Sequence, residues 1–351
     1  MQPLLRDSMS FKYIQKIPDV GSILAEMPLS QDLKEMKARR DAMIKDIITG
    51  KSDKFLLIIG PCSADNEGAV CEYVQRLAKL QEKVAERIVL IPRIYTNKPR
   101  TTGEGYKGMA HQPIPTEDPD IVAGLKALRK MHLRVLKETH LTAADEMLYP
   151  DNYPYLEDVL SYVAIGARSV ENQQHRLTVS GLDIPVGMKN PTSGDLRVML
   201  NSVQAAQNPH EFIYHEWEVN TSGNPLAHCV LRGATDHDGK SIPNYHYEDM
   251  TKLAQMYLKR GFANPTIIVD TNHANSDKKF AEQPRIAMEV MESRKKSDIL
   301  KKMVKGLMIE SYLVEGAQNV SEKVYGKSIT DPCMGWEGSE RLVLALADRL
   351  F

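Results

Sequence analysis

The chain has 351 residues, of which 42% are hydrophobic and 26% charged, and its formal net charge is −1. This composition is ordinary for a globular protein, and the balanced charge argues against a nucleic-acid or anionic-membrane partner. No apolar run is long enough to span a membrane, and the first residues lack the apolar segment of a secretory signal peptide. The four cysteines show no paired spacing, so we expect a reduced, cytoplasmic protein.

Residues 1–50 are expected to form an extension ahead of the main domain, which would cover residues 51–351. Residues 1–28 show no regular pattern. Residues 30–49 carry apolar residues at helical spacing, and Gly50 would end that helix. The sequence therefore predicts an N-terminal helical extension followed by a larger domain.

From residue 55 onward, short apolar runs alternate with longer amphipathic segments. We interpret the apolar runs as strands, at residues 55–60, 88–94, 133–139, 163–169, 184–190, 227–233, 266–273 and 306–311. Helical spacing is clearest at residues 68–84, 120–132, 194–208, 247–262 and 283–304. Alternation of strand and helix indicates an α/β fold with a parallel sheet. Eight units of similar length favour closure into a (β/α)8 TIM barrel over a doubly wound open sheet.

In a barrel of this kind, the residues that follow the strands converge on one rim, where the chemistry takes place. One group of these residues is cationic: Arg93, Lys98, Arg100, Arg168, Lys189 and Arg232. Arginine side chains suit phosphate and carboxylate groups, and six cations exceed what one phosphate requires. We therefore expect two anionic substrates, or one substrate with several anionic groups.

A second group of residues offers potential metal ligands: Cys62, His273, Glu310 and, from the loop after the last strand, Asp331. One thiolate, one imidazole and two carboxylates suit Mn, Fe, Co or Zn better than Mg or Ca. The four positions form no short metal motif, so two alternatives stay open. His273 could be a hydrogen-bonded core histidine, and Cys62 with His273 could form a nucleophile–base pair. The third and seventh strands would bring further acidic residues to the rim, namely Glu138, Glu146 and Asp270.

Ten short segments occur in a fixed order along the chain. They are IGPCS (59–63), KPRTT (98–102), GARS (166–169), HR (175–176), PVGMKN (185–190), VNTSGN (219–224), LRG (231–233), HAN (273–275), ESYLVEG (310–316) and YGKSITD (325–331). Together they closely resemble the type I 3-deoxy-D-arabino-heptulosonate 7-phosphate (DAHP) synthases of the aromatic pathway. The resemblance runs from about residue 10 to the C-terminus, and the segments match in register.

This resemblance implies a (β/α)8 barrel with an N-terminal helical extension and a transferase activity. The family condenses phosphoenolpyruvate with D-erythrose 4-phosphate and water to give DAHP and phosphate. This is the first step of the shikimate pathway to chorismate and the aromatic amino acids, and two phosphorylated substrates would account for the cluster of cations. A barrel does not need the helix at residues 30–49 to close, so we expect a homodimer or homotetramer.

The resemblance also implies roles for individual residues. One divalent metal ion, Mn²⁺ foremost with Fe²⁺, Co²⁺ or Zn²⁺ as alternatives, would be held by Cys62, His273, Glu310 and Asp331. The phosphoenolpyruvate site would comprise Arg93, Glu146, Ala167, Arg168, Lys189 and Arg232. The erythrose 4-phosphate site would comprise Lys98, Arg100, Thr101 and Asp270. The catalytic residues would be Cys62, His273, Asp331 and, as a proton carrier, Lys189.

Several alternatives and departures accompany this resemblance. Lys189 could form a Schiff base in a metal-independent aldolase, the barrel could bind a phosphorylated ligand without catalysis, or the aldose could be arabinose 5-phosphate. Residues 211–219 are shorter than the inhibitor-binding hairpin of regulated relatives, which puts feedback inhibition by an aromatic amino acid in question, and residues 235–243 are longer than expected. Cys333 could approach Cys62, either as a buried thiol or as its partner in an oxidative disulfide.

Overall fold

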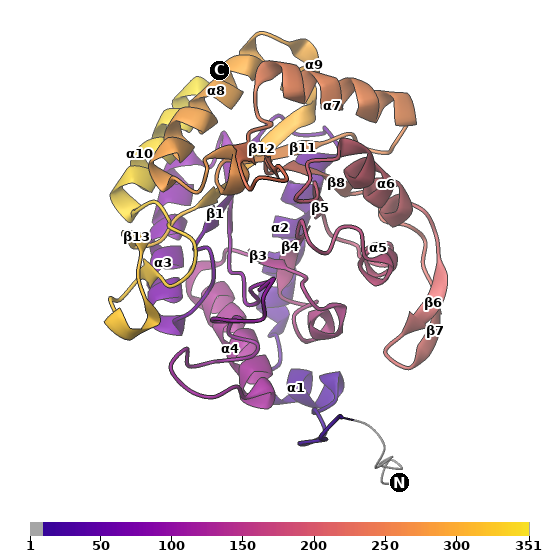
Figure 1. The fold of residues 1–351 in the computed structure, drawn as a ribbon, viewed down its shortest axis with the longest axis vertical. Helices are drawn as coiled ribbons and strands as arrows, with labels where there is room; N and C mark the ends of the chain where they lie inside the picture. Colours follow the sequence, from indigo (N-terminus) through magenta and orange to yellow (C-terminus); the bar gives the residue numbers. More distant parts are fainter. Residues whose placement is uncertain (1–9, 351) are drawn as a thin grey trace.

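Eight parallel strands form the centre of the molecule and close into a barrel (Figure 1). The computed structural model describes residues 10–350, so the expectations for residues 1–9 lie outside the described part of the chain. The barrel strands are β1 (Phe55–Gly60), β2 (Ile88–Pro92), β3 (Ala143–Glu146), β4 (Leu160–Ile165), β5 (Val186–Lys189), β8 (Ala227–Leu231), β11 (Ile267–Asp270) and β12 (Val304–Glu310). Every residue of β1 and β2 is buried, as their continuous apolar sequences require when helices cover a parallel sheet. The predicted (β/α)8 barrel is confirmed.

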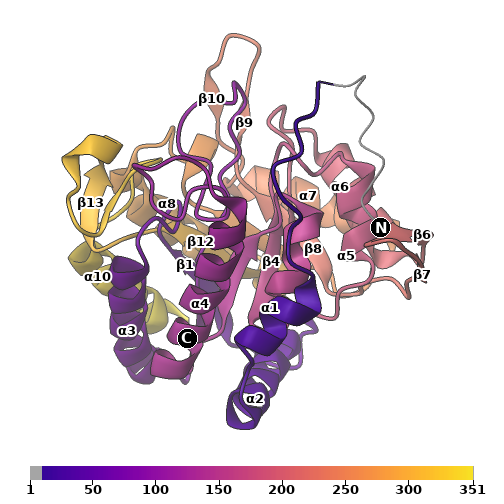
Figure 2. The same ribbon diagram turned by 90° about the horizontal axis from the view of Figure 1, so that it is seen from below.

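Helices cover the outside of the barrel, and short elements lie at its rim and edge (Figures 1 and 2). The helices are α1 (Val20–Glu26), α2 (Gln31–Ile48), α3 (Glu67–Val84), α4 (Ile121–Thr139), α5 (Gln173–Val179), α6 (Leu196–Gln207), α7 (Tyr247–Arg260), α8 (Gln283–Lys295), α9 (Asp298–Met303) and α10 (Trp336–Arg349). Short 3-10 turns are η1 (Pro150–Tyr155), η2 (His273–Asn275), η3 (Phe280–Glu282) and η4 (Val320–Glu322). Three small strand pairs are β6 (Glu211–Tyr214) with β7 (Trp217–Asn220), β9 (Ala234–Thr235) with β10 (Ser241–Ile242), and β13 (Val314–Ala317) with β14 (Lys327–Ser328). None of the described helices is long and apolar enough to cross a membrane.

The barrel is closed by a seam between β2 and β3. The strands follow the order β2-β1-β12-β11-β8-β5-β4-β3, so β2 and β3 are the two ends of the sheet. In the described part of the chain, an isolated parallel bridge between Arg93 and Ala144 joins these ends, and Ile94 N donates to Ala144 O at 2.9 Å. The seam is therefore weaker in backbone hydrogen bonds than the other strand pairs.

Helix α2 closes the bottom of the barrel, where the strands begin. Its residues Ile44, Ile47 and Ile48 are at most 1% exposed and belong to one cluster with Leu56 and Ile58 of β1. In Figure 2, α2 lies on the opposite side of the barrel from the projecting β9–β10 hairpin. The other end of the barrel, where the strands finish, carries the rim residues.

The predicted third strand is wrong. Residues 133–139 form the last turns of α4, because Val135 and Leu136 continue the apolar face of that helix, and His140 with a φ of 56° ends it. The true third strand is β3, four residues further on. Glu138 therefore lies on the outer surface, where it pairs with Arg134, and not at the rim.

Two helix predictions also need correction. Residues 20–26, expected to be irregular, form α1, which begins under the cap of the Asp19 carboxylate. The single helix expected at residues 283–304 is divided in two. Ser297 caps the new helix α9, and Val304 already belongs to β12.

Candidate active site

The C-terminal ends of the strands enclose a cavity of roughly 120 Å³. Most of the residues predicted from the sequence line it: Cys62, Arg93, Lys98, Arg100, Glu146, Ala167, Arg168, Lys189, Arg232, His273 and Asp331. Glu310 and Asp270 are buried against these lining residues, at 1% and 0% exposure, and Thr101 contacts Arg168 at the outer edge. The structure therefore brings the predicted residues together, with Glu138 as the exception.

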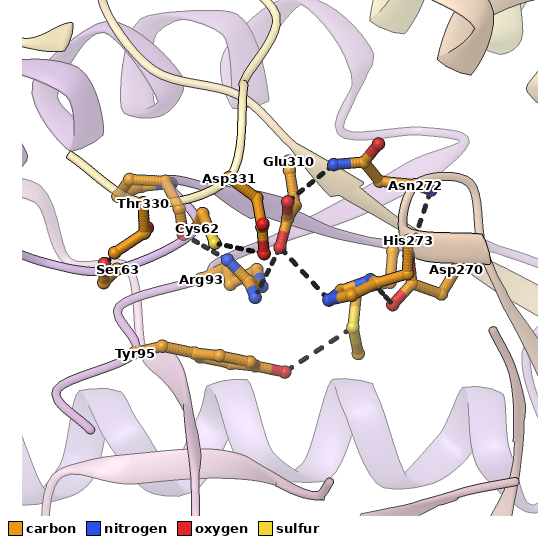
Figure 3. Close-up of polar contacts among 12 residues, drawn as sticks. Cys62, Ser63, Arg93, Tyr95, Asp270, Asn272, His273, Glu310, Thr330 and Asp331 are labelled. Atoms are coloured by element: carbon orange, nitrogen blue, oxygen red, sulfur yellow. Dashed lines mark hydrogen bonds and ion pairs between the residues drawn. The ribbon is translucent and has the colours of Figure 1, made fainter. Parts of the chain in front are cut away.

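Cys62, Glu310 and Asp331 form the centre of the site (Figure 3). One potential ligand atom of each residue, a thiol sulfur or a carboxylate oxygen, lies within 4.8 Å of the other two. Gly60 is the last residue of β1 and Pro61 follows it, which places Cys62 at the rim; Glu310 ends β12, and Asp331 lies on the loop after β14. A thiol beside two carboxylates is a donor set that suits a transition-metal ion.

The ammonium group of Lys98 lies against this trio. Lys98 Nζ is 2.8 Å from both Cys62 Sγ and Asp331 Oδ2. Burial opposes the charge on Lys98, but Asp331 and the thiolate that Cys62 forms at high pH together outweigh burial and raise the lysine pKa. Burial, followed by the charge of Glu310, raises the pKa of Cys62 to about 11. The free thiol thus keeps its proton at neutral pH, and Asp331 is the anionic partner of Lys98.

Glu310 connects the trio to three further side chains (Figure 3). Its Oε1 lies 2.9 Å from Arg93 Nη2 and 3.6 Å from His273 Nε2, and its Oε2 accepts a hydrogen bond from Asn272 at 2.6 Å. Burial opposes ionisation of Glu310, but the charges of Arg93, His273 and Lys98 together outweigh burial and lower the carboxyl pKa. Glu310 Oε1 is buried and makes no well-aligned hydrogen bond to the residues described, so it is available as a ligand.

A buried carboxylate orients both Lys189 and His273. Asp270 Oδ2 accepts a hydrogen bond from Lys189 Nζ at 3.0 Å and lies 2.9 Å from His273 Nδ1, an ion-pair contact without an aligned hydrogen bond within the described chain. Burial would raise the pKa of Asp270, but the charges of His273 and Lys189 outweigh it and lower the pKa. A carboxylate on Nδ1 leaves Nε2 facing Glu310, which is the usual arrangement of a metal-binding histidine. His273 has a left-handed φ of 51°, a strained conformation of the kind found at functional sites.

The arginines of the site carry donors suited to an anion. Arg93 stacks on Tyr95, with its guanidinium carbon 3.7 Å from the ring centroid, and donates to the Pro61 carbonyl. Arg232 is largely buried, which lowers its pKa, and its Nη1 has no hydrogen-bond partner among residues 10–350. Arg168 Nε donates to the Thr101 hydroxyl at 2.9 Å.

The residue patterns at the strand ends did not predict every residue of the site: Tyr95, Asn97, Asn272 and Lys278 belong to it as well. Lys278 lines the cavity, and its Nζ lies 3.0 Å from Asp331 Oδ1, on the carboxylate oxygen that Lys98 leaves free. Its proximity to the HAN segment is a signal that could have indicated Lys278. The stacking of Tyr95 and the contact of Asn272 with Glu310 depend on the folded geometry and leave no mark in the sequence.

The contacts of Cys62 bear on two alternatives: a nucleophile–base pair with His273, and a close approach to Cys333. Cys62 contacts Lys98 and Asp331, whereas His273 contacts Asp270 and Glu310, so the geometry does not favour a Cys62–His273 nucleophile–base pair. Cys62 N donates to Cys333 Sγ at 3.3 Å. The two thiols are therefore neighbours, and both are buried and free.

Comparison with known proteins places the chain in a family. The model of the DAHP synthetase I family matches residues 10–344. The phospho-2-dehydro-3-deoxyheptonate aldolase of Haemophilus influenzae is 37% identical over 345 residues, which are 96% of this chain and 92% of that protein. The Phe-sensitive enzyme of the same name from Escherichia coli K12 is 35% identical over 350 residues, 97% of each chain.

A solved structure of a protein with the same name as these relatives also matches this chain. The phospho-2-dehydro-3-deoxyheptonate aldolase of Francisella tularensis superposes with a TM-score of 0.90 at 30% identity, covering 97% of this chain and 98% of that one. The resemblance noted in the sequence is confirmed, and the family together with the Cys62, Glu310 and Asp331 trio supports a divalent metal ion at this rim. The chain belongs to the DAHP synthetase I family.

Proposed function

We propose that this protein is a 3-deoxy-7-phosphoheptulonate synthase, a transferase that condenses phosphoenolpyruvate with D-erythrose 4-phosphate and water. The products are DAHP and inorganic phosphate, and the reaction is the first step of the shikimate pathway. The observation that carries the proposal is a single cavity in which cations surround the trio of Cys62, Glu310 and Asp331. Several cations in one cavity suit substrates that together carry two phosphate groups and one carboxylate.

The trio and His273 fit one divalent transition-metal ion. The fit rests on the mixed donor set and on the buried Glu310 Oε1, which lacks an aligned hydrogen bond within the described chain. Mn²⁺ is the ion we propose, with Fe²⁺, Co²⁺ and Zn²⁺ as alternatives. When bound, it would supply Lewis-acid polarisation of a carbonyl oxygen.

We assign phosphoenolpyruvate to the inner part of the cavity, at Arg93, Glu146, Ala167, Arg168, Lys189 and Arg232. Support comes from the buried donors Arg93 Nε and Arg232 Nη1, which lack partners within residues 10–350. A Cβ at Gly166 would lie 2.2 Å from Glu146 Oε1, so glycine lets this carboxylate approach the backbone next to Ala167. The phosphate and carboxylate would thus meet arginine donors on one side and a main-chain wall on the other.

We assign erythrose 4-phosphate to the outer edge, at Lys98, Arg100 and Thr101. Arg100 is oriented by a hydrogen bond from its Nε to Tyr106 O at 2.9 Å, and Thr101 is held by Arg168. The resemblance implies the same role for Asp270, but its side chain is 0% exposed and contacts Lys189 and His273. We therefore propose that Asp270 acts on the sugar indirectly, by orienting those two residues.

The reaction can be written with these residues. Carbon 3 of phosphoenolpyruvate attacks the aldehyde carbon, and the aldehyde oxygen becomes a hydroxyl by taking a proton, for which Lys189 is the proposed carrier. Water adds at carbon 2 and loses one proton to solvent. The carbon–oxygen bond to phosphate then breaks with its electron pair, the new hydroxyl on carbon 2 gives its proton to the departing phosphate, and the ketone of DAHP and inorganic phosphate are formed. The arginines hold the departing phosphate throughout.

The test is to identify the product from each candidate aldose. We expect a seven-carbon keto-acid phosphate by mass spectrometry from erythrose 4-phosphate and much slower turnover of arabinose 5-phosphate. Borohydride added during turnover should trap no covalent adduct on Lys189. A trapped adduct would favour the Schiff-base aldolase, and no product from any aldose would favour the phospho-ligand-binding barrel.

We also propose a homodimer or homotetramer, assembled in part through the segment ahead of the barrel. Support comes from apolar side chains that are largely exposed near the N-terminus and on the β6–β7 hairpin, namely Phe11, Tyr13, Ile14, Ile213 and Trp217. Light scattering after gel filtration would show a monomer if this is wrong.

The proposed cytoplasmic location is consistent with four free cysteines.

A further inference from the structure

The seam between β2 and β3 is closed at the rim by a side chain. Next to the bridge formed by Ile94 N and Ala144 O, a parallel ladder would direct the amide of Thr96 to the carbonyl of Glu146. That carbonyl instead accepts from Leu148 N at 2.9 Å. Thr96 N donates to Asp145 Oδ1 at 2.9 Å, so the carboxylate takes the place of the missing ladder bond.

The Asp145 carboxylate lies in an unusual place for a charge. Ala144 faces the barrel interior, so Asp145 faces the helix layer, where it is 3% exposed beside Leu128 and Val163. Burial of an ionised carboxylate among apolar side chains is costly unless donors compensate for the lost water. A carboxylate in this position therefore needs a structural or functional reason.

Three donors and one histidine surround the carboxylate. Besides the Thr96 amide, the Thr96 hydroxyl donates to Oδ2, and Glu146 N donates to Oδ1 at 2.7 Å. His132 Nε2 of helix α4 lies 3.8 Å from Oδ2, and neither ring nitrogen of this buried histidine has another hydrogen-bond partner in the described chain. The carboxylate thus joins β3, the end of β2 and α4 in one polar cluster.

Residues of the active site follow directly on both sides of this cluster. Thr96 is two residues before Lys98, whose Nζ contacts Cys62 and Asp331. Glu146, whose amide binds the same carboxylate, lines the cavity from the β3 side. We therefore expect the position of the Asp145 carboxylate to set the distance across the seam between Lys98, which follows β2, and Glu146, which ends β3.

We propose that Asp145 is a positioning residue for this reaction. Its carboxylate closes the barrel seam through Thr96, and thereby holds Lys98 in place for the aldose phosphate, opposite Glu146. The kinetic part of this inference rests on the proposed function. The structural part, a seam closed by a side chain, does not.

The chain offers a matched pair of variants. Thr96→Val keeps the side-chain shape and removes the hydroxyl that donates to Asp145. Thr142→Val, at the residue just before β3, removes a hydroxyl that is equally buried and has no hydrogen-bond partner among the described residues. Thr96→Ser restores a hydroxyl, and Asp145→Asn weakens the acceptor without a change of size.

Two measurements are made on each variant. We expect Thr96→Val and Asp145→Asn to raise the KM for erythrose 4-phosphate by about tenfold or more, as for loss of a hydrogen bond to a charged group. The KM for phosphoenolpyruvate should change by less than about threefold, since both variants keep Arg93, Arg232 and the Asp145 Oδ1 that accepts from Glu146 N. Hydrogen exchange of the amides of Thr96, Asn97, Lys98 and Arg100 should become faster in the same variants, and Thr96→Ser should resemble the wild type.

Each outcome decides the inference. If Thr96→Val and Thr142→Val behave alike in both measurements, Asp145 does not position the site. Faster exchange with an unchanged KM would also overturn the positioning role and leave only a structural bond. If the wild-type protein itself proved inactive, the proposed function would be wrong. The exchange rates would still show whether the Asp145 carboxylate closes the seam.

Discussion

Lys98 belongs to the proposed erythrose 4-phosphate site and also contacts two proposed metal ligands. Its ammonium group lies at 2.8 Å from both a thiol sulfur and a carboxylate oxygen that we assign to the metal. Lys278 approaches the second oxygen of the same carboxylate, so Asp331 is held by two lysines. Metal, lysine and substrate phosphate are therefore expected to depend on one another at this point.

Removal of the thiol tests the metal assignment at the residue scale. We expect Cys62→Ser to weaken binding of Mn²⁺ by at least about 100-fold, since even residues that only support metal ligands contribute up to this much. Cys71→Ser is the matched control, because Cys71 is buried to the same 1% exposure but lies on α3 outside the site. Competition against a fluorescent chelator measures both affinities. Equal affinity in the two variants would remove Cys62 from the metal site.

A buried histidine makes the stability of the barrel depend on pH. His228 is bonded to the Tyr162 hydroxyl at 2.8 Å, and burial lowers its pKa from 6.5 to about 4. Between these values the unfolded chain binds a proton that the folded one does not, so stability falls as the pH drops from 6.5 to about 4.

The expected slope from this one group is about 1.4 kcal/mol per pH unit. His228→Gln cannot take up a proton, so its unfolding free energy should fall less steeply over the same pH range. Urea unfolding of both proteins at several pH values measures the difference. Parallel curves would show that His228 is not the titrating group.

The grouping of most site residues could be predicted from residue types at strand ends and in the loops that follow them. Cys62, Glu310 and Asp331 are far apart in the chain, yet the rule that parallel strands finish at one rim was enough to group them. Asn272 and the carboxylate of Asp145 could not be found in this way. Their roles come from hydrogen bonds that form only when particular strands lie side by side.

Among the elements, α2 has a larger part in the core than its place ahead of the barrel suggests. Its isoleucines pack in the same cluster as the inner side chains of the strands. We expect Ile47→Ala to lower the free energy of unfolding by about 2–5 kcal/mol, as for loss of a buried aliphatic side chain. Met43→Ala on the same helix is the control, because Met43 is 39% exposed. Denaturant unfolding with equal losses in the two variants would contradict the packing described.

The elements also show where sequence patterns are ambiguous. Residues 133–139 contain enough branched apolar side chains to resemble a strand, but they continue the helical face of α4. The true strand β3 has the sequence AADE, without a β-branched or aromatic residue. Its neighbours in the sheet, and not its own composition, make it a strand.

At the scale of the whole molecule, the number of barrel strands and the fold class could be predicted from the sequence. The pair of strands between which the barrel closes could not. Eight repeated units predict a barrel of parallel strands. Which pair forms the weak seam depends on the register of β2 and β3, and the sequence alone does not encode this in a visible pattern. The net charge of −1 likewise conceals a strongly cationic cavity, because the compensating acids lie elsewhere on the surface or beneath the rim.

The most direct test of the account is release of inorganic phosphate from phosphoenolpyruvate, with erythrose 4-phosphate present or absent, before and after metal removal by a chelator. We predict that release requires both substrates, disappears when the metal is removed, and returns when Mn²⁺ is added. Release that persists in protein shown to be free of metal would contradict the role of the Cys62, Glu310 and Asp331 trio. No release with both substrates and Mn²⁺ present would contradict the proposed condensation itself.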